Sequence, residues 1–428
     1  MNSNRTSKKQ IFGWVMYDFA NSAYTTLVVT FIYGTYFVSA IAPDKIYGTA
    51  LWSRGVTITA LLVAFLSPFL GAIADQGHLR KAFLFVSTLV CVAGTCLLYF
   101  VMPGQVYWAL TWFILSNVAF ELGMVFYNAF LPEVSTPKTI GRVSGVGWGI
   151  GYIGGMAAMF IAMAGFVSPE VPWFGFSKAA GENIRATNLL VGVWFAVFAL
   201  PLFVFVKSRP ALSKARGTLS LVRASFQDIK TTFHDIQDYK EIVTLLIARM
   251  IYNDGLVTIF AFGGIYAAGT FGFSFQEIMI FGIALNVAAG IGALIMGVFD
   301  DKPGGKKTIQ ISNIVLALAA LLAVVAPGKS LFWVAGMVVG FFAGPNQSAS
   351  RSLLGRFVPR DKENQFFGFF AFSGKLTAFL GPLLLGVLTQ AFDSQRAGIA
   401  VVVLFFIIGG IILVFVDEEK GMAAARKE

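Results

Sequence analysis

The feature that most constrains this chain is a series of apolar segments, each long enough to cross a lipid bilayer, separated by short polar loops. Of the 428 residues, 57% are hydrophobic and only 13% are charged. A backbone that spans a bilayer must satisfy its hydrogen bonds internally, so segments of this length predict helices. We expect an all-α integral membrane protein with the bilayer as a partner. The twelve predicted transmembrane helices are residues 12–41, 48–73, 82–102, 106–131, 140–166, 187–206, 241–268, 275–299, 308–327, 330–354, 364–391 and 396–416.

Lysine and arginine residues are concentrated in the termini and in the loops after even-numbered predicted spans. Because the cytoplasmic loops of membrane proteins carry an excess of lysine and arginine, this distribution predicts that both termini are cytoplasmic. The net charge of +10 is spread over these loops rather than along one stripe, so we expect no nucleic-acid partner. The first apolar segment is too long for the core of a signal peptide, which predicts an uncleaved first helix.

The chain contains an internal repeat. Gly71 and Asp75 at the end of the second predicted span are matched by Gly297 and Asp301 at the end of the eighth, at one constant offset. Agreeing offsets of this kind predict two six-helix, pseudo-symmetric bundles. We expect an N-terminal bundle (1–206), a cytoplasmic linker (207–240) and a C-terminal bundle (241–428).

The linker has a helical pattern of its own. Apolar residues between Val222 and Ile236 recur at spacings of three and four, which predicts an amphipathic helix on the cytoplasmic surface. We interpret it as a linker that rests on lipid headgroups.

The loop after the second span carries Gly71, Asp75, Gly77 and Arg80-Lys81. This pattern, with its second copy from Gly297 to Lys307, resembles the signature loop of the major facilitator superfamily. The first copy departs from the family pattern at Gln76, where a basic residue is usual, whereas Lys302 keeps that residue in the second copy.

A second stretch narrows the resemblance. Residues 17–24, with the sequence YDFANSAY, resemble the opening motif of the vacuole-effluxer-like branch of this superfamily. Fungal members of that branch are linked to amino-acid release from the vacuole. The resemblance implies the major facilitator fold and a transporter, and we expect it in the bacterial inner membrane.

The resemblance also implies which helices meet. Asp75 should lie against the eleventh span near residue 364, and Asp301 against the fifth span near residue 140. Such contacts would close the cytoplasmic side of a central cavity lined by the first, fourth, seventh and tenth spans. The expected cytoplasmic gate residues are Gly71, Asp75, Gly77, Arg80, Gly297, Asp301, Lys302 and Arg351.

Polar and ionisable residues lie inside several spans. Asp18, Asn21 and Tyr24 are spaced by three, so they share one face of the first helix. An ionisable group in a bilayer is costly and usually faces a bundle interior or a watery cavity. The expected substrate and proton pathway comprises Asp18, Asn21, Tyr24, Glu121, Arg249, Asn253, Asp254 and Lys375.

Ion pairs inside the spans are the main alternative to ligand binding. We expect a salt-bridged gate between Glu121 and Arg351, and we expect Arg249 to neutralise Asp18 or Glu121. For Glu121, Arg249 and Lys375 a purely structural ion pair is an equal alternative. Tyr252-Asn253-Asp254 resembles Tyr17-Asp18 in the other half, so Asp18 and Asp254 form a repeat-related pair of acids.

These observations predict a secondary transporter that works by alternating access, and we expect a monomer. The expected cargo is a small polar solute such as an amino acid, exported with proton coupling. The alternatives are another cargo (a drug, sugar, peptide or lysolipid) and a non-transporting membrane sensor. No nucleophile–base pair, metal-ligand set or phosphate-binding loop is apparent in the sequence, so we expect neither an enzyme nor a cofactor.

Overall fold

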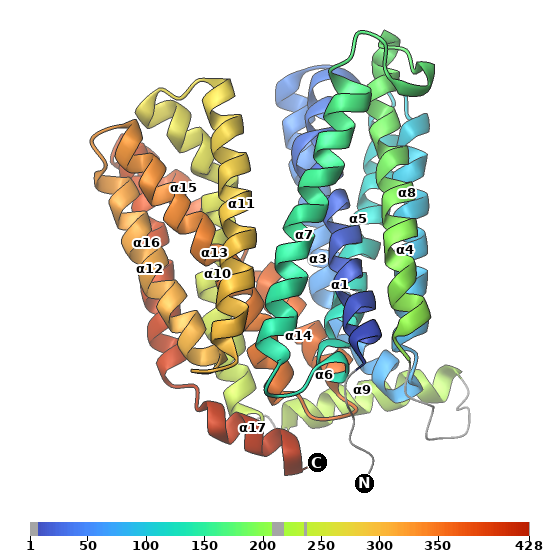
Figure 1. Cartoon of the computed structure of the whole chain (residues 1–428), viewed down its shortest axis with the longest axis vertical. Helices are drawn as coiled ribbons and strands as arrows, with labels where there is room; N and C mark the ends of the chain where they lie inside the picture. Colours follow the sequence, from blue (N-terminus) through green and yellow to red (C-terminus); the bar gives the residue numbers. More distant parts are fainter. Residues whose placement is uncertain (1–6, 208–217, 235–237, 428) are drawn as a thin grey trace.

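The computed structural model describes residues 7–207, 218–234 and 238–427, and all regular elements in these ranges are helices (Figure 1). The helices of the first half are α1 (Lys8–Ala23), α2 (Tyr33–Tyr36), α3 (Lys45–Gly77), α4 (Arg80–Leu97), α5 (Val106–Asn128), α6 (Leu131–Val134), α7 (Ile140–Ala162) and α8 (Glu182–Phe205). The remainder are α9 (Thr218–His234), α10 (Lys240–Phe271), α11 (Phe275–Asp300), α12 (Gly305–Val325), α13 (Lys329–Phe357), α14 (Glu363–Leu376), α15 (Leu380–Ala391), α16 (Gln395–Val414) and α17 (Glu418–Lys427).

The predicted spans are found as helices. Within the described residues, eleven helical segments are long and apolar enough to cross a membrane. The predicted span 330–354 forms α13 but is not one of these eleven. Its C-terminal half carries Ser350, Arg351, Ser352 and Arg356, all of them buried in the protein. A helix surrounded by other helices does not need an apolar surface, which explains the difference.

Two spans are irregular. The first span is helical from Lys8 to Ile41, but wider π-type turns at Tyr24–Phe31 and Phe37–Ile41 interrupt it. The predicted span 364–391 is divided into α14 and α15 by three residues that are not helical. Pro382 lacks the N–H that would bond to the carbonyl of residue 378, so the helical hydrogen-bond ladder is weakened at this position.

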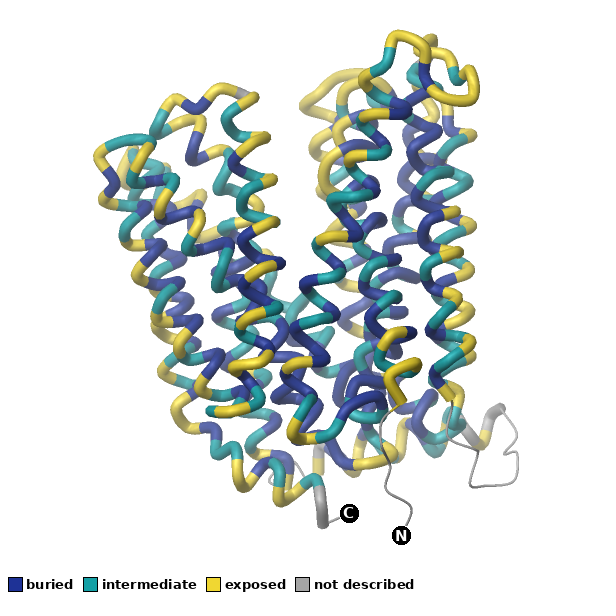
Figure 2. The backbone as a smooth tube through the Cα atoms, in the orientation of Figure 1, coloured by how far each residue is buried: buried dark blue, intermediate teal, exposed yellow. Residues whose placement is uncertain are grey.

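The helices are grouped in two bundles. One core cluster lies between Trp14 and Val206, and the other runs mainly from Tyr239 to Val416. Figure 1 shows the bundles side by side, in contact at the end where both chain termini lie and diverging toward the opposite end. The buried backbone in Figure 2 is accordingly continuous from one bundle to the other near that end. We call it the terminal end.

The linker helix α9 lies across the terminal end (Figure 1). The predicted helix is present, although Ile236 lies outside the described residues. Its buried face includes Ile229 and Thr232, and the ring of Phe226 is 5.1 Å from that of Phe69 on α3. One face of α9 therefore packs on the protein, and its contact with lipid headgroups stays a prediction.

Candidate functional site

The first contact between the bundles at the terminal end is made by Asp75 near the end of α3. Its Oδ1 accepts hydrogen bonds from the backbone N–H and the side-chain amide of Asn364, at 3.1 and 2.6 Å, and its Oδ2 accepts from the N–H of Gln365 at 2.8 Å. These N–H groups belong to the first turn of α14, where backbone N–H groups have no acceptor within the helix. The positive end of the helix dipole at this turn also favours a negative charge. A Cβ on Gly71 would collide with the backbone of Asn364, so glycine allows this close approach. The hydrogen bonds confirm the predicted contact near residue 364.

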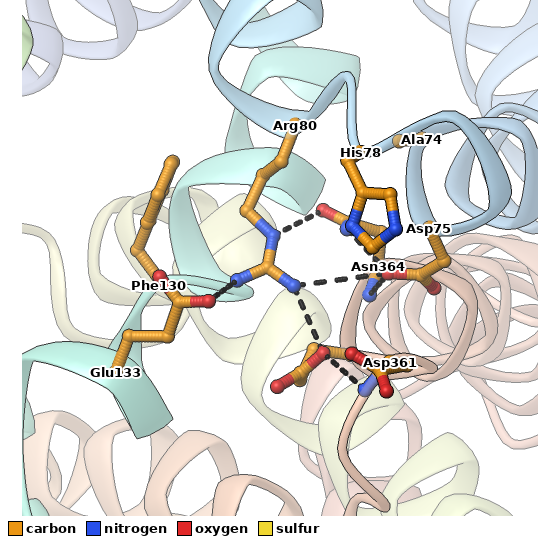
Figure 3. Close-up of a pocket in the computed structure, with 9 residues that line it drawn as sticks. Ala74, Asp75, His78, Arg80, Phe130, Glu133, Asp361 and Asn364 are labelled. Carbon is orange, nitrogen blue, oxygen red and sulfur yellow. Dashed lines mark hydrogen bonds and ion pairs between the residues drawn. The ribbon is translucent and has the colours of Figure 1, made fainter. Parts of the chain in front are cut away.

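Arg80 joins the same contact from the start of α4 (Figure 3). Its Nη1 lies 2.9 Å from the Glu133 carboxylate in the N-terminal bundle, and its Nη2 lies 3.0 Å from Glu363 on α14. The Nε donates to the side-chain oxygen of Asn364 at 3.0 Å. One guanidinium therefore links carboxylates of both bundles around Asp75, which lies 3.7 Å from Nη2.

The second contact repeats this arrangement with the bundles exchanged. Asp301 follows α11 of the C-terminal bundle and accepts hydrogen bonds from the N–H groups of Gly141 (2.9 Å) and Arg142 (3.2 Å), in the first turn of α7. Gly297 and Gly145 bring α11 and α7 close together, since a Cβ on either would collide with the other backbone. The prediction near residue 140 is thus confirmed. Burial raises the pKa of the Asp301 carboxyl, although the two N–H donors and nearby guanidinium groups oppose this effect.

Two of the expected gate residues lie outside these contacts. Gly77 is the last residue of α3 and precedes His78, whose φ of 53° is left-handed. Lys302 has an exposed side chain, and its role in the gate stays a prediction. The cations beside Asp301 are Arg142 of α7, at 3.5 Å, and the buried Arg356 of α13, at 3.6 Å. We predicted neither Arg142 nor Arg356. The only sequence signal for Arg356 is a basic position in the last turn of the tenth predicted span.

Deeper in the protein, Asp18 of α1 forms an ion pair with Arg351 of α13, across the two bundles. The Nη1 of Arg351 lies 3.2 Å from Asp18 Oδ2 and 3.2 Å from Asn128 Oδ1. Its Nε donates to the Ser144 hydroxyl at 2.9 Å, and its Nη2 donates to the Ser144 carbonyl at 2.8 Å. Every nitrogen of this guanidinium therefore has an acceptor, and all of these acceptors belong to the N-terminal bundle.

Aromatic rings complete the surroundings of Arg351. The guanidinium carbon lies 4.7 Å from the ring centroid of Trp14, 5.7 Å from that of Trp148 and 5.9 Å from that of Tyr127. Aromatic faces attract a cation, most strongly where water is excluded. Arg351 is only 3% exposed, so this residue of the C-terminal bundle is enclosed by the N-terminal one.

A second ion pair crosses between the bundles. Lys375 of α14 donates to Glu121 of α5 at 2.6 Å, and the two side chains are 30% and 22% exposed. The structure thus corrects the expected pairs: Arg351 binds Asp18 rather than Glu121, and Lys375 occupies the place at Glu121 that we expected Arg351 or Arg249 to take.

Arg249 and Asp254, both on α10, have no oppositely charged partner within the described residues. Arg249 donates from Nη1 to the carbonyl of Phe370 (2.8 Å) and to the hydroxyl of Ser373 (3.0 Å), and its guanidinium lies 3.6 Å over the Phe370 ring. Asp254 is only 1% exposed and accepts a hydrogen bond from Thr377, in the break between α14 and α15, at 3.1 Å. Among the described residues, Arg249 and Asp254 therefore lack a counter-ion, whereas Asp18 pairs with Arg351 and Glu121 pairs with Lys375.

The remaining predicted pathway residues form hydrogen bonds within or between helices. Asn21 donates to Asp18 Oδ1 at 3.4 Å within α1, whereas Asn253 of α10 donates to the carbonyl of Gly374 on α14 at 3.4 Å. The Tyr24 hydroxyl is 2.8 Å from that of Ser116 on α5. Polar side chains commonly join helices within membranes in this way.

The sequence of this chain matches a known protein family over most of its length. The model of the family described as vacuole effluxer Atg22 like matches residues 45–426. An uncharacterized MFS-type transporter of Bacillus subtilis, YxiO, is 28% identical, covering 98% of this chain and 97% of its own. Autophagy-related protein 22 of Yarrowia lipolytica is 22% identical, covering 94% of this chain and 79% of its own.

Solved structures with a similar fold include two proton symporters. The major facilitator transporter FucP in its outward conformation has a TM-score of 0.73 at 12% identity, with 96% of this chain and 98% of that chain covered. The proton:xylose symporter XylE has a TM-score of 0.70 at 13% identity, with 96% and 95% covered.

Proposed function

The chain belongs to the vacuole effluxer Atg22-like family of transporters, and from this premise we propose that it exports a small polar solute by alternating access, driven by a proton gradient. Its fold is that of the major facilitator superfamily. We propose an amino acid as cargo because residues 17–24 resemble the opening motif of this branch. The proposed location is a bacterial inner membrane.

The observation that carries this proposal is the nature of the contacts at the terminal end. The bundles are held there by acids that cap helices of the opposite bundle, Asp75 on α14 and Asp301 on α7, and deeper in the protein by the Asp18–Arg351 ion pair. Polar contacts of this kind can be exchanged for water when the bundles separate. A two-bundle transporter needs a closure that is specific but reversible.

The basic loops give the closed end an orientation. If the termini are cytoplasmic, as the loop charges predict, the described contacts close the cytoplasmic side and the bundles diverge toward the outside. We propose that residues 1–206 and 241–428 rock as two units, each with its own apolar core. Export then requires the terminal-end contacts to break so that cargo can enter from the cytoplasm.

Counterflow in proteoliposomes tests this function. Vesicles loaded with an unlabelled amino acid should take up the same labelled amino acid from outside, and an imposed pH gradient should accelerate net flux. Lys329→Gln, which alters a partly exposed ion pair with Glu277, is a control variant that should behave like the wild type. Absence of counterflow for every amino acid would remove this cargo class. Counterflow of a sugar or drug instead would retain the transporter and change the cargo.

A further inference from the structure

We infer that Arg249 on α10 is the binding point for a carboxylate group of the transported solute. The inference rests on the proposed transport function and narrows its cargo to carboxylate-bearing molecules. It starts from a comparison of two guanidinium groups on the helices of the C-terminal bundle, those of Arg351 and Arg249. These groups have the same chemistry but very different surroundings.

The hydrogen bonds of Arg249 leave one side of its guanidinium open. Nη1 uses its two protons on the Phe370 carbonyl and the Ser373 hydroxyl, whereas no acceptor among the described residues bonds to Nε or Nη2. Neither of these nitrogens is a sealed, unpaired polar atom, since both are absent from the buried atoms that lack a partner. Nε and Nη2 together form the fork that binds a carboxylate with two parallel hydrogen bonds. In Arg351 the same three nitrogens all have protein acceptors.

The protein itself does not supply a carboxylate to this fork. Asp18 is bound to Arg351 and Glu121 to Lys375, so two of the acids inside the spans are already neutralised. Asp254 accepts its hydrogen bond from Thr377 and has no cationic partner within the described part of the chain. A cation within a membrane protein is retained at a cost, and such residues typically mark a ligand pathway.

The position of Arg249 suits a solute that enters between the bundles. It lies nine residues from the start of α10, roughly 14 Å along the helix axis. Its contacts on α14, Phe370 and Ser373, lie five and two residues before Lys375, which reaches across to the N-terminal bundle. A solute carboxylate at Arg249 would therefore contact the helix that joins the two bundles.

Asp254 is too deep to hold the other end of a small solute. It is five residues from Arg249, roughly 7 Å along the axis, and is 1% exposed. An α-amino acid separates its carboxylate and ammonium groups by less than this. The inference thus assigns recognition to the carboxylate and leaves Asp254 available for the proton.

Ligand-induced stabilisation of the purified full-length protein tests this directly. The probes are L-amino acids, monocarboxylates and dicarboxylates, each paired with its amide, for example L-leucine with leucinamide and isocaproate with its amide. Carboxylates are expected to raise the melting temperature and their amides are not. Isocaproate, which lacks the amine, should compete with leucine.

Two variants separate the role of Arg249 from folding. Arg249→Lys keeps the charge but loses the fork, and we expect at least about tenfold weaker carboxylate binding, because the second of the two parallel charge-assisted hydrogen bonds is lost. Arg249→Gln should abolish binding. Lys329→Gln is the matched control for loss of a positive charge, and the melting temperature without ligand shows whether each variant is folded.

The outcomes distinguish the inference from the proposed function. Equal stabilisation by amides, or unchanged carboxylate affinity in folded Arg249→Lys, would overturn the inference while leaving transport of another cargo intact. Carboxylate binding that depends on Arg249, without counterflow, would support the inference and contradict transport. Lack of any response to carboxylates would overturn the inference as well.

Discussion

Asp18 and Asp254 lie within one residue of each other in the register of the internal repeat, yet the structure places them in different electrostatic environments. Asp18 is held by the guanidinium of Arg351, which reaches it from the opposite bundle at 3.2 Å. Asp254 has only the Thr377 hydroxyl at 3.1 Å and no cation among the described residues. Both acids are buried, at 6% and 1% exposure.

The difference shows how a symmetric scaffold can divide two tasks. A buried ion pair across the bundles has to be broken whenever they separate, so Asp18 is suited to closure. A buried acid without a cation is instead suited to exchange a proton, and the Arg249 fork on the same helix is open to cargo. On this account the N-terminal acid holds the bundles together and the C-terminal bundle handles the transported species.

The largest effect is expected from separating the Asp18–Arg351 pair. Arg351→Met leaves Asp18 buried without its cation, which should cost about 3–5 kcal/mol and abolish counterflow. The double variant Asp18→Asn with Arg351→Met removes both charges and should recover part of the lost thermal stability. Melting temperature and counterflow measure these changes. A double variant that is no more stable than Arg351→Met would show that the pair is not coupled.

The next largest effect should distinguish the functions of Asp18 and Asp254. Asp254→Asn is expected to reduce proton-driven net flux by about tenfold or more, corresponding to about 1.4 kcal/mol, while counterflow at equal pH persists. Asp18→Asn should instead impair both assays, because closure is needed for each. The measurement is the net flux of cargo with and without a pH gradient. Retention of full proton coupling in Asp254→Asn would assign the proton to another residue.

A smaller loss of stability is expected when either helix cap, Asp75 or Asp301, is removed. Asp75→Ala and Asp301→Ala each remove acceptors for helix N–H groups, with an expected loss of about 0.5–2 kcal/mol. Asp75 should lose more, because it accepts three hydrogen bonds at Asn364 and Gln365. Burial raises the pKa of Asp301, so its charge is disfavoured and Asp301→Asn should lose less than Asp301→Ala. Melting temperatures test this order. A larger loss for Asp301→Ala than for Asp75→Ala would show that the number of accepted hydrogen bonds does not set the strength of a cap.

The smallest effect is expected at Glu121–Lys375. Both side chains are partly exposed, so water screens the pair and Lys375→Met should cost no more than about 0.2–1 kcal/mol. The apparent affinity for cargo in counterflow should change by less than about fivefold, equivalent to about 1 kcal/mol. A loss as large as that of Arg351→Met would make this pair, rather than Asp18–Arg351, the main closure.

The parts of this arrangement that follow from sequence are those set by local pattern. Apolar length predicts the spans, and the spacing of glycine and aspartate around Asp75 and Asp301 identifies the two caps through the family resemblance. The partner of Arg351 could not be predicted in this way, because Asp18 is 333 residues away and the pair depends on how two bundles meet. Similarly, Arg356 looks like an ordinary basic residue at a helix end until α11 is packed beside it.

The break between α14 and α15 illustrates a second reason why contacts inside the protein could not be predicted from the sequence. Pro382 is visible in the sequence, but prolines inside spans are tolerated when neighbours satisfy the freed carbonyls. Only the structure shows that Asn253 bonds to the Gly374 carbonyl and that Thr377 turns toward Asp254. The sequence therefore identifies the polar residues inside the spans, whereas their pairing required the fold and their role in a transport pathway stays a prediction.

The distance between spin labels at Lys138 and Arg360, which are exposed on opposite bundles, tests the central claim most directly. Cys91 and Cys96 are replaced first, and a pair at Lys138 and Glu170 within one bundle serves as the control. The account predicts that, without cargo, Asp18→Asn lengthens the distance between the bundles while Asp254→Asn leaves it unchanged. Lengthening in Asp254→Asn alone, or no change in Asp18→Asn, would contradict it.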